Sequence, residues 1–490
     1  MPIQSINPAT GQVLRSFEPL AAEAIKVKIA TAHQCFKEYI DTPLEHRALC
    51  MRKLAGILEH EVEELATVMT QEMGKTLASA RQEVLKCATG CRYYADNAAR
   101  ILSEEPIDTP GNKSYVRWDP LGVLLAVMPW NFPFWQVFRF LSPALMGGNV
   151  ILLKHASNVP QCALTIESLV RRAGFPRGAF QTLLIESRQV ESVLADERVV
   201  AVTVTGSEAA GRAVAAQAGW LIKKSVLELG GSDPFVVMPS ANLEQAVTAA
   251  VKARCLNNGQ SCIAAKRFIV HEEIYSEFEE RFVAMMEGLK IGDPMQETTD
   301  IGPLATPQLV EDLLQQVQAA TRAGGRVLAG GERMVGAGNF FEPTVIAGVP
   351  RTAAVYRDEF FGPVAMLFRV SSLEEAIEVA NDTPFGLGAS VWTLDAEEQH
   401  RLVAKIDSGQ VFVNAIVASD PRLPFGGTKK SGYGRELSAA GMREFLNAKT
   451  VVIAGVVQNE IPFESKTAED GAHPAENFQA ALHMALKDSE

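Results

Sequence analysis

Residues 199–211 read VVAVTVTGSEAAG. The first seven of them are all valine, alanine or threonine, as in a buried strand, and Gly206 and Ser207 then lead into a helical stretch. This order of strand, glycine-containing turn and helix is the setting in which a pyrophosphate binds at a helix N-terminus. The turn lacks the full G-x-G-x-x-G pattern, so alone it is a weak signal. It makes Thr205, Gly206 and Ser207 candidates for nucleotide contacts.

Similar apolar runs recur on both sides of this stretch. They lie at residues 122–128, 149–154, 234–238, 268–270 and 324–331. Amphipathic stretches with helical spacing lie between them, at 161–173, 242–255 and 273–289, and fill much of the first hundred residues, at 21–39, 44–73 and 82–102. Strands that alternate with helices predict parallel sheets covered on both faces. We therefore expect two α/β units, joined near residue 230.

Composition narrows the class of protein. The chain has 490 residues, 47% of them hydrophobic, and a formal net charge of -12, which argues against a nucleic-acid-binding surface. No apolar run reaches the roughly 18 residues of a membrane span, and the N-terminus lacks signal-peptide features. The seven cysteines are odd in number and form no metal-ligand pattern, so we expect no disulfide framework, no metal site and a reducing cytoplasm.

One cysteine stands in a setting that suits chemistry. Cys262 ends the string NGQSC at residues 258–262, where its neighbours are small and polar. A reactive thiol attacks as the thiolate and needs a base nearby, whereas an inert cysteine is apolar filler. None of the eight histidines has a recognisable catalytic context, which disfavours a protease or amidase built on a Cys-His pair.

Two further strings supply the missing groups. Glu228 lies in LELGG at 227–231, and a carboxylate beside leucines can have its pKa raised towards the range of a general base. Asn131 lies in PWNFP at 129–133, where its amide can donate to a developing oxyanion. The alternatives are a surface glutamate at a strand end and an asparagine that caps a turn.

Together these strings resemble the aldehyde dehydrogenase superfamily. The resemblance covers roughly residues 5–455, and six motifs occur in the family's order: PWNFP at 129–133, TGSEAAG at 205–211, LELGG at 227–231, NNGQSC at 257–262, EFFGP at 359–363 and PFGGTKKSGYGRE at 424–436. The family's fold implies two Rossmann-like α/β domains and a small β oligomerisation element. The expected cofactor-binding domain is 1–102 with 121–228, the catalytic domain 229–436, the oligomerisation element 103–120 with 437–456, and the acidic tail 457–490.

The resemblance also implies roles for residues. Cys262 would attack the aldehyde carbon to form a thiohemiacetal, and the Asn131 side chain and the Cys262 N–H would hold the oxyanion. Hydride transfer to the nicotinamide would leave a thioester, which water activated by Glu228 would hydrolyse. The expected cofactor-binding residues are Trp130, Lys154, Ser157, Thr205, Gly206, Ser207, Glu359 and Phe361.

A departure from the family pattern concerns the cofactor. The family often has Lys-Pro-Ala-Glu where this chain has Lys154-His155-Ala156-Ser157. A glutamate there accepts hydrogen bonds from the adenine-ribose hydroxyls and repels a 2'-phosphate. Ser157 removes that charge while Lys154 remains to pair with phosphate, so we expect NADP to be preferred over NAD.

The substrate is expected to carry a far carboxylate. Arg139 follows Asn131 by eight residues, as in succinate-semialdehyde dehydrogenases, where an arginine grips that group; Ser419 resembles a serine that also meets it, and Trp135 would shape the pocket. The alternative is that Arg139 is an ion-pair residue on a helix surface. Some such enzymes have a second arginine six residues before the nucleophile, where this chain has Leu256.

The leading expectation is therefore NADP-dependent oxidation of succinate semialdehyde to succinate by a homodimer or homotetramer. The nearest alternatives are glutarate semialdehyde or a simple aliphatic aldehyde as substrate. A non-catalytic relative is disfavoured because Cys262, Glu228 and Asn131 are all present. A CoA-acylating variant is disfavoured by Glu228, because such enzymes dispense with water activation.

Overall fold

The computed structural model describes residues 2–455. The chain divides into two compact units. Of the described residues, unit 1 comprises those up to 104 together with 117–449, and unit 2 comprises 105–116 and 450–455. Within residues 2–455, no helix combines the length and the apolar character that a membrane crossing requires.

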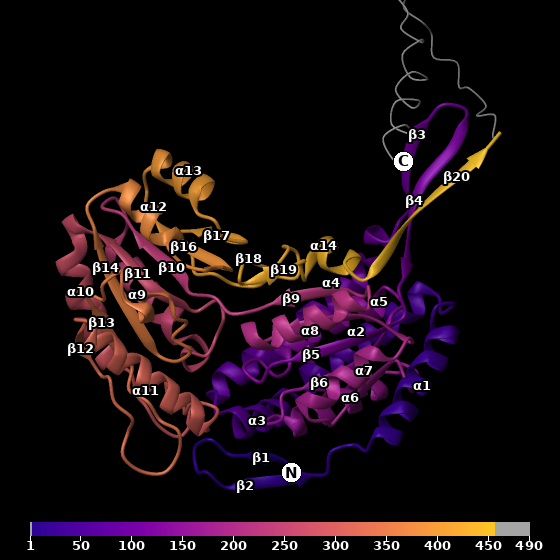
Figure 1. Cartoon of the computed structure of the whole chain (residues 1–490), viewed down its shortest axis with the longest axis horizontal. Helices are drawn as coiled ribbons and strands as arrows, with labels where there is room; N and C mark the ends of the chain where they lie inside the picture. Colours follow the sequence, from indigo (N-terminus) through magenta and orange to yellow (C-terminus); the bar gives the residue numbers. More distant parts are fainter. Residues whose placement is uncertain (1, 456–490) are drawn as a thin grey trace, which may run out of the picture. The chain divides into compact units, whose positions relative to one another are not determined.

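The first half of unit 1 is built on a six-stranded sheet with the order β19-β9-β8-β5-β6-β7 (Figure 1). Its strands are β5 (Val123–Met128), β6 (Val150–His155), β7 (Phe180–Thr182), β8 (Val199–Thr205), β9 (Lys224–Glu228) and β19 (Gly432–Tyr433). All neighbours are parallel except β19, which pairs antiparallel with β9. The strand β19 thus returns to this sheet from late in the chain.

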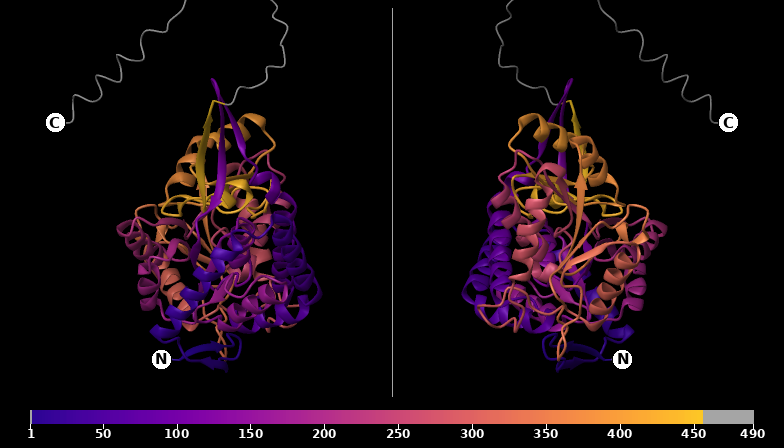
Figure 2. Two further views of the ribbon diagram at one scale, coloured as in Figure 1. Left: turned by 90° about the vertical axis from the view of Figure 1, so that its right-hand side faces the viewer. Right: turned by 90° about the vertical axis from the view of Figure 1, so that its left-hand side faces the viewer.

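Helices cover this sheet and one another. Those that contact its strands are α1 (Ala22–Tyr39), α5 (Trp135–Met146), α6 (Pro160–Arg172), α7 (Val190–Ala195) and α8 (Glu208–Trp220). A further layer packs on α5 and α6 and consists of α2 (Leu44–His60), α3 (Val62–Met73) and α4 (Leu77–Ile101). A hairpin of β1 (Ile3–Ile6) and β2 (Val13–Phe17) lies at the N-terminus, at the lower edge of the molecule in Figure 2.

The second half of unit 1 holds a seven-stranded sheet with the order β12-β13-β14-β11-β10-β16-β17. Its strands are β10 (Asp233–Val237), β11 (Ala265–His271), β12 (Arg326–Ala329), β13 (Thr344–Ala347), β14 (Val364–Val370), β16 (Gly388–Trp392) and β17 (Gln410–Val413). All pairs are parallel except β12 with β13. The associated helices are α9 (Leu243–Cys255), α10 (Glu272–Glu287), α11 (Pro307–Arg322), α12 (Leu373–Asn381) and α13 (Ala396–Lys405).

Unit 2 is a small β structure. Strand β3 (Glu105–Thr109) pairs antiparallel with β4 (Asn112–Pro120), from Glu105 opposite Val116 to Thr109 opposite Asn112. In the three-stranded sheet, β4 lies between β3 and β20 (Leu446–Ala454). Unit 1 also contains the short helix α14 (Ser438–Arg443) and the two-stranded pair of β15 (Phe385–Gly386) and β18 (Thr428–Lys429).

The predicted fold class, with two parallel-sheet α/β halves, is confirmed. Boundaries differ in places: the helical stretch predicted over 44–73 is two helices that meet at Glu61, and α4 begins at Leu77 rather than at residue 82. The segment 437–456, expected as part of the β element, also contains α14. The predicted domain limits stay predictions, and the predicted acidic tail over 457–490 lies outside the described residues.

Parallel pairing brings the candidate residues to one edge of the six-stranded sheet. Thr205 at the end of β8 is in register with Glu228 at the end of β9, and Val127 near the end of β5 is in register with Lys154 near the end of β6. Carboxyl ends of parallel strands share an edge, where α/β proteins bind their ligands. Asn131 follows the end of β5 by three residues and so begins at this edge.

Candidate active site

The backbone before Cys262 is bent by three consecutive left-handed residues. Asn257 and Asn258 have φ angles of 57° and 58°, and Gly259 has a φ of 75°. Asparagine tolerates this conformation better than most residues, and a Cβ added at Gly259 would lie 2.3 Å from the carbonyl carbon of Gly362. The string NNGQSC therefore encodes a bend that fits only asparagine-like residues followed by glycine.

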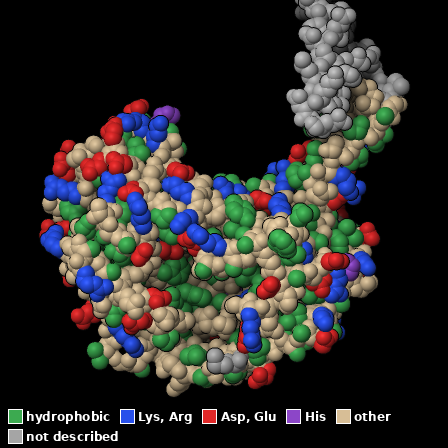
Figure 3. Space-filling model, viewed as in Figure 1, with side chains coloured by type: hydrophobic (Ala, Val, Ile, Leu, Met, Phe, Trp, Pro, Cys, Tyr) green, Lys and Arg blue, Asp and Glu red, His purple; other side chains and the backbone are tan. Residues whose placement is uncertain are grey.

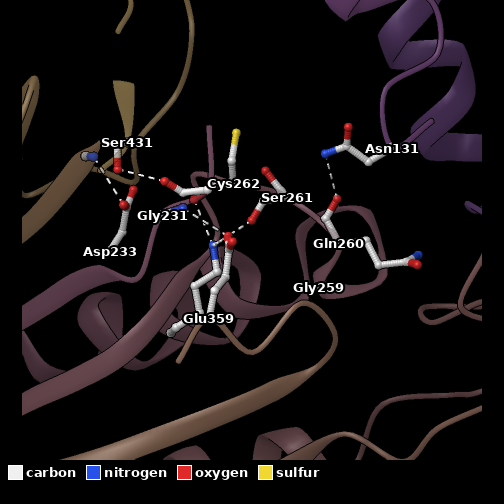
Figure 4. A network of polar contacts seen from close by, with 12 residues as sticks. Asn131, Gly231, Asp233, Gly259, Gln260, Ser261, Cys262, Glu359 and Ser431 are labelled. Atoms are coloured by element: carbon white, nitrogen blue, oxygen red, sulfur yellow. Dashed lines mark hydrogen bonds and ion pairs between the residues drawn. The ribbon is translucent and has the colours of Figure 1, made fainter. Parts of the chain in front are cut away.

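Buried cations hold this bend in place. Lys266 Nζ donates to the carbonyl oxygens of Ser261 and Cys262, both at 2.7 Å, and Arg254 donates to the carbonyl of Gly259 at 2.6 Å. Both cations are fully buried. In Figure 4 the Cys262 sulfur points away from the polar contacts around its backbone. The backbone is thus fixed while the half-buried thiol projects from it.

Asn131 is fixed beside this bend. Its side-chain Nδ2 donates to the carbonyl of Gln260 at 3.1 Å, and its own carbonyl accepts from Asn257 Nδ2 at 2.7 Å (Figure 4). The alternative of a turn-capping asparagine fails, because the acceptor is 129 residues away in sequence. An amide nitrogen carries two N–H groups, so one remains for an oxyanion. The oxyanion role of Asn131 stays a prediction, and this hydrogen bond beside Cys262 is compatible with it.

Glu228 is buried, not on the surface. Only 2% of it is exposed, and neither carboxyl oxygen has a hydrogen-bond partner among residues 2–455. Desolvation raises the pKa of Glu228 well above its usual value; Glu436 raises it further, while Arg139 and Arg435 oppose the shift. Burial therefore favours the protonated form of this carboxyl more than in an exposed glutamate. A group with a raised pKa at the sheet edge suits proton transfer.

The nicotinamide-side candidates adjoin the same backbone. Glu359 Oε1 accepts from the Gly231 N–H at 3.0 Å and lies 3.2 Å from Lys266 Nζ (Figure 4). Phe361 packs edge-on against Trp130, with ring centroids 5.7 Å apart. Glu359 and Phe361 also line a cavity of about 550 Å³ beside α11. Figure 3 shows that the face viewed in Figure 1 is hollowed, with hydrophobic side chains in the hollow and charges of both signs around it.

The phosphate-side candidates lie at strand ends and a helix start. Ser207 caps α8, its Oγ accepting from Ala210 N–H at 3.3 Å, so the other N–H groups of the first turn can meet an anion. Lys154 is almost buried and has no ion-pair partner in the described chain, and burial lowers the pKa of its ammonium. Ser157 is exposed three residues further on. An uncompensated ammonium beside a serine fits a phosphate group.

The substrate-side candidate Arg139 lies in a buried ion pair. Arg139 is 2% exposed, forms an ion pair with the buried Glu436, and stacks over the Phe425 ring at 4.5 Å. The alternative of a helix-surface ion pair is wrong because the pair is buried. Glu436 balances the charge of the guanidinium. Its role as the carboxylate clamp stays an untested prediction.

Trp135 and Ser419 do come together. Trp135 Nε1 donates to Ser419 Oγ at 3.0 Å. The structure adds a third member, because Lys86 Nζ donates to the same oxygen at 2.7 Å and lies 4.6 Å from the centroid of the Trp135 ring. Lys86 was not among the site residues predicted from the sequence.

The chain is similar to known proteins along most of its length. The aldehyde dehydrogenase family model matches residues 1–451. The chain belongs to this family. A curated relative from Mycobacterium tuberculosis, named succinate-semialdehyde dehydrogenase (NADP+) 1, is 54% identical over 457 residues, covering 93% of this chain and 100% of the relative. A probable succinate-semialdehyde dehydrogenase (NADP+) from Synechocystis is 53% identical over 454 residues, covering 93% and 100%.

Solved structures agree with the family assignment. The crystal structure of succinic semialdehyde dehydrogenase from Streptococcus pyogenes with NADP+ is 40% identical and superposes with a TM-score of 0.91, covering 92% of this chain and 100% of that one. The resemblance expected from the six motifs is thereby confirmed. As a member of this aldehyde-oxidising family, the protein is an NAD(P)-dependent oxidoreductase.

Three residues of this aldehyde dehydrogenase site escaped sequence reasoning. Lys266 lies four residues after Cys262 and directly before Arg267 and the apolar run 268–270, and two ionisable residues beside a predicted strand were an available signal. Glu436 ends the PFGGTKKSGYGRE motif, yet its partner is 297 positions away. Lys86 lies on an ordinary amphipathic helix and carried no local signal at all.

Proposed function

We propose that this protein oxidises succinate semialdehyde to succinate with NADP+ as the oxidant. The relatives named as NADP-dependent succinate-semialdehyde dehydrogenases are 53–54% identical to this chain, and the matches cover 93% of it and 100% of each relative. The reaction class rests on one observation above all: the Asn131 amide is bonded to the Gln260 carbonyl, two residues before a thiol that projects from a fixed bend. That arrangement suits attack on a carbonyl carbon with an oxyanion donor alongside.

In the proposed mechanism, Cys262 attacks the aldehyde carbon and a thiohemiacetal forms. Burial raises the pKa of the Cys262 thiol to about 12, with Arg139 and Lys266 opposing the shift, so the thiol must lose its proton as it attacks. Asn131 Nδ2 and the Cys262 N–H hold the oxyanion. When bound, NADP+ would accept the hydride that the thiohemiacetal must lose to become a thioester. Glu228, once deprotonated, takes a proton from the water that hydrolyses the thioester.

Preference for NADP rests on Lys154 and Ser157. The Lys154 ammonium has no carboxylate partner in the part of the chain that the structure describes, and no acidic side chain stands at position 157. Trp130, Thr205, Gly206, Ser207, Glu359 and Phe361 would hold the rest of the cofactor. NAD is expected to bind more weakly, because it cannot use the charge of Lys154.

Assembly as a homodimer or homotetramer in the cytoplasm belongs to the same proposal. In the sheet β20-β4-β3, the outer strands β20 and β3 each pair with one strand among residues 2–455. An edge strand with free N–H and C=O groups is suited to strand addition by a second copy of the chain.

Initial rates of reduced-cofactor formation at 340 nm test the proposal. Succinate semialdehyde, glutarate semialdehyde and butanal would each be supplied with NADP and with NAD. We expect the highest kcat/KM for succinate semialdehyde with NADP. Equal rates on all aldehydes would leave only a general aldehyde dehydrogenase, and a preference for NAD would refute the Ser157 argument. Loss of turnover in Cys262→Ala checks that the activity belongs to this site.

A further inference from the structure

The cluster of Lys86, Trp135 and Ser419 offers hydrogen-bond donors but no free acceptor. A serine hydroxyl has two acceptor lone pairs and one O–H. Ser419 Oγ already accepts from Lys86 Nζ at 2.7 Å and from Trp135 Nε1 at 3.0 Å. The Ser419 hydroxyl can therefore still donate its proton in a hydrogen bond, and the ammonium of Lys86 has two further N–H groups. A set of this kind is complementary to an anion with two acceptor atoms.

The charge of Lys86 is not balanced within the described chain. Lys86 forms no ion pair among residues 2–455, and the nearby Asp420 is bound through both oxygens by Arg422, at 2.8 and 2.6 Å. The other cation near this place, Arg139, is paired with Glu436. Lys86 is also half-buried, whereas Arg139 is almost fully buried. Of the two cations, Lys86 is the more exposed and the one without an ion-pair partner among residues 2–455.

Helix α4 places Lys86 against the predicted pocket wall. Gly90 lies one turn further along the same helix face, and a Cβ there would stand 3.3 Å from Cζ3 of Trp135. Glu83, one turn earlier, accepts from the Trp135 backbone N–H at 2.8 Å. The indole is thus held over α4 by the residues before and after Lys86. The ammonium is therefore kept at the indole and at Ser419 by a packed helix, not by a mobile loop.

We propose that Lys86, together with the Ser419 hydroxyl, binds the carboxylate at the far end of the aldehyde substrate and so determines its specificity. The inference rests on the proposed function and gives the carboxylate a partner other than the guanidinium of Arg139. Lys86 is a specificity residue here, because it takes no part in bond formation at Cys262. A short aldehyde without the carboxylate would leave this receptor unused.

The test compares charged and uncharged aldehydes of equal chain length. In Lys86→Met we expect KM for succinate semialdehyde to rise about 10- to 100-fold, as for loss of a charge-assisted hydrogen bond, with kcat/KM for butanal changed less than about twofold. Lys86→Arg should restore most of the affinity. The control Lys53→Met removes an exposed lysine of α2 and should change neither KM. Equal losses on both aldehydes, or no loss on either, would overturn the inference.

A second readout uses product inhibition of butanal oxidation. Succinate should inhibit the wild type, and Lys86→Gln should weaken that inhibition at least about tenfold; Lys86→Gln also replaces Lys86→Met if the latter does not fold. Unchanged inhibition would contradict the role of Lys86. If the wild type itself does not favour succinate semialdehyde over butanal, the proposed function fails instead, so the two failures are distinguishable.

Discussion

At the scale of single residues, the site depends on ionisable groups kept out of water. Glu228, Lys266 and Arg254 are all buried, and each lies within a few residues of a glycine or of the nucleophile. Burying a charge is costly unless the group is paired or neutralised. Lys266 donates to two backbone carbonyls and Arg254 to one, whereas neither carboxyl oxygen of Glu228 has a hydrogen-bond partner in the described chain. Burial therefore favours the neutral form of Glu228 and raises its pKa.

The first prediction concerns Glu228→Gln. An amide is nearly isosteric with the protonated acid, so the variant should fold, but it cannot deprotonate water. We expect rapid formation of about one reduced cofactor per site followed by turnover slowed at least about 100-fold, measured by stopped-flow absorbance at 340 nm. A steady-state rate like that of the wild type would show that another group activates water.

The same variant tests the raised pKa. A carboxyl with a folded-state pKa above its unfolded value contributes stability that is fully present below the unfolded pKa and is lost as pH rises through the folded pKa. Wild-type unfolding free energy should therefore fall relative to Glu228→Gln as pH increases above about 4.5, by about 1.4 kcal/mol per unit of pKa elevation. Urea unfolding at a series of pH values measures this. Parallel pH profiles would mean that Glu228 is not desolvated.

At the scale of elements, helix α5 is anchored by the buried Glu83 of α4, which is ion-paired with Lys75. Glu83 Oε1 accepts from the backbone N–H groups of Phe134 and Trp135, both at 2.8 Å, at the start of α5. Its other oxygen pairs with Lys75, which is buried and lies 4.3 Å from the Phe132 ring. The loop that carries Asn131 is thus tied to α4 at its helical end. His155 ties it again, with Nε2 2.8 Å from the Pro133 carbonyl.

The second prediction is that Glu83→Gln destabilises the protein strongly. Loss of the carboxylate leaves the Lys75 ammonium buried without a counter-charge, which typically costs about 3–5 kcal/mol. The matched control is Glu63→Gln, which removes a carboxylate that is 65% exposed and pairs with Arg81, and we expect a much smaller loss of stability there. Urea unfolding of both variants provides the comparison. Equal, small effects would show that the Lys75–Glu83 pair contributes little.

At the scale of the whole molecule, the described chain ends in an exposed edge strand. Val452 and Ile453 of β20 are 57% and 43% exposed, although valine and isoleucine are usually buried. Natural proteins protect such edges, and pairing with a second chain is one way to do so. This observation belongs to unit 2 alone and bears on assembly, not on catalysis.

The third prediction is that charges on β20 weaken assembly. The double variant Val452→Lys and Ile453→Lys should elute as a smaller species than the wild type in size-exclusion chromatography with light scattering. The control Val27→Lys changes an exposed valine of α1, 64% exposed, and should leave the mass unchanged. An unaltered mass in the double variant would exclude β20 from the interface.

Much of the fold and of the catalytic site could be predicted from the sequence, because strands and turns are encoded by residues close together in the chain. Strand β8 lies at 199–205 as predicted, since an apolar run before a glycine turn encodes a buried parallel strand. The bend before Cys262 is likewise written into NNGQ, because its φ angles suit only asparagine and glycine. Helix ends were less well predicted, as at Leu77, since capping and packing shift them by several residues.

The sequence by itself determined the two α/β halves, the family and the chemical groups at the catalytic centre, because strand periodicity, turn residues and ordered motifs are short-range properties. Only the tertiary structure decided which charged side chains near the site form ion pairs and which do not. It paired Arg139 with Glu436, and it brought Lys86 to Ser419, 333 residues away. Such pairings depend on how packed helices and returning loops meet, and the residue types alone do not specify that.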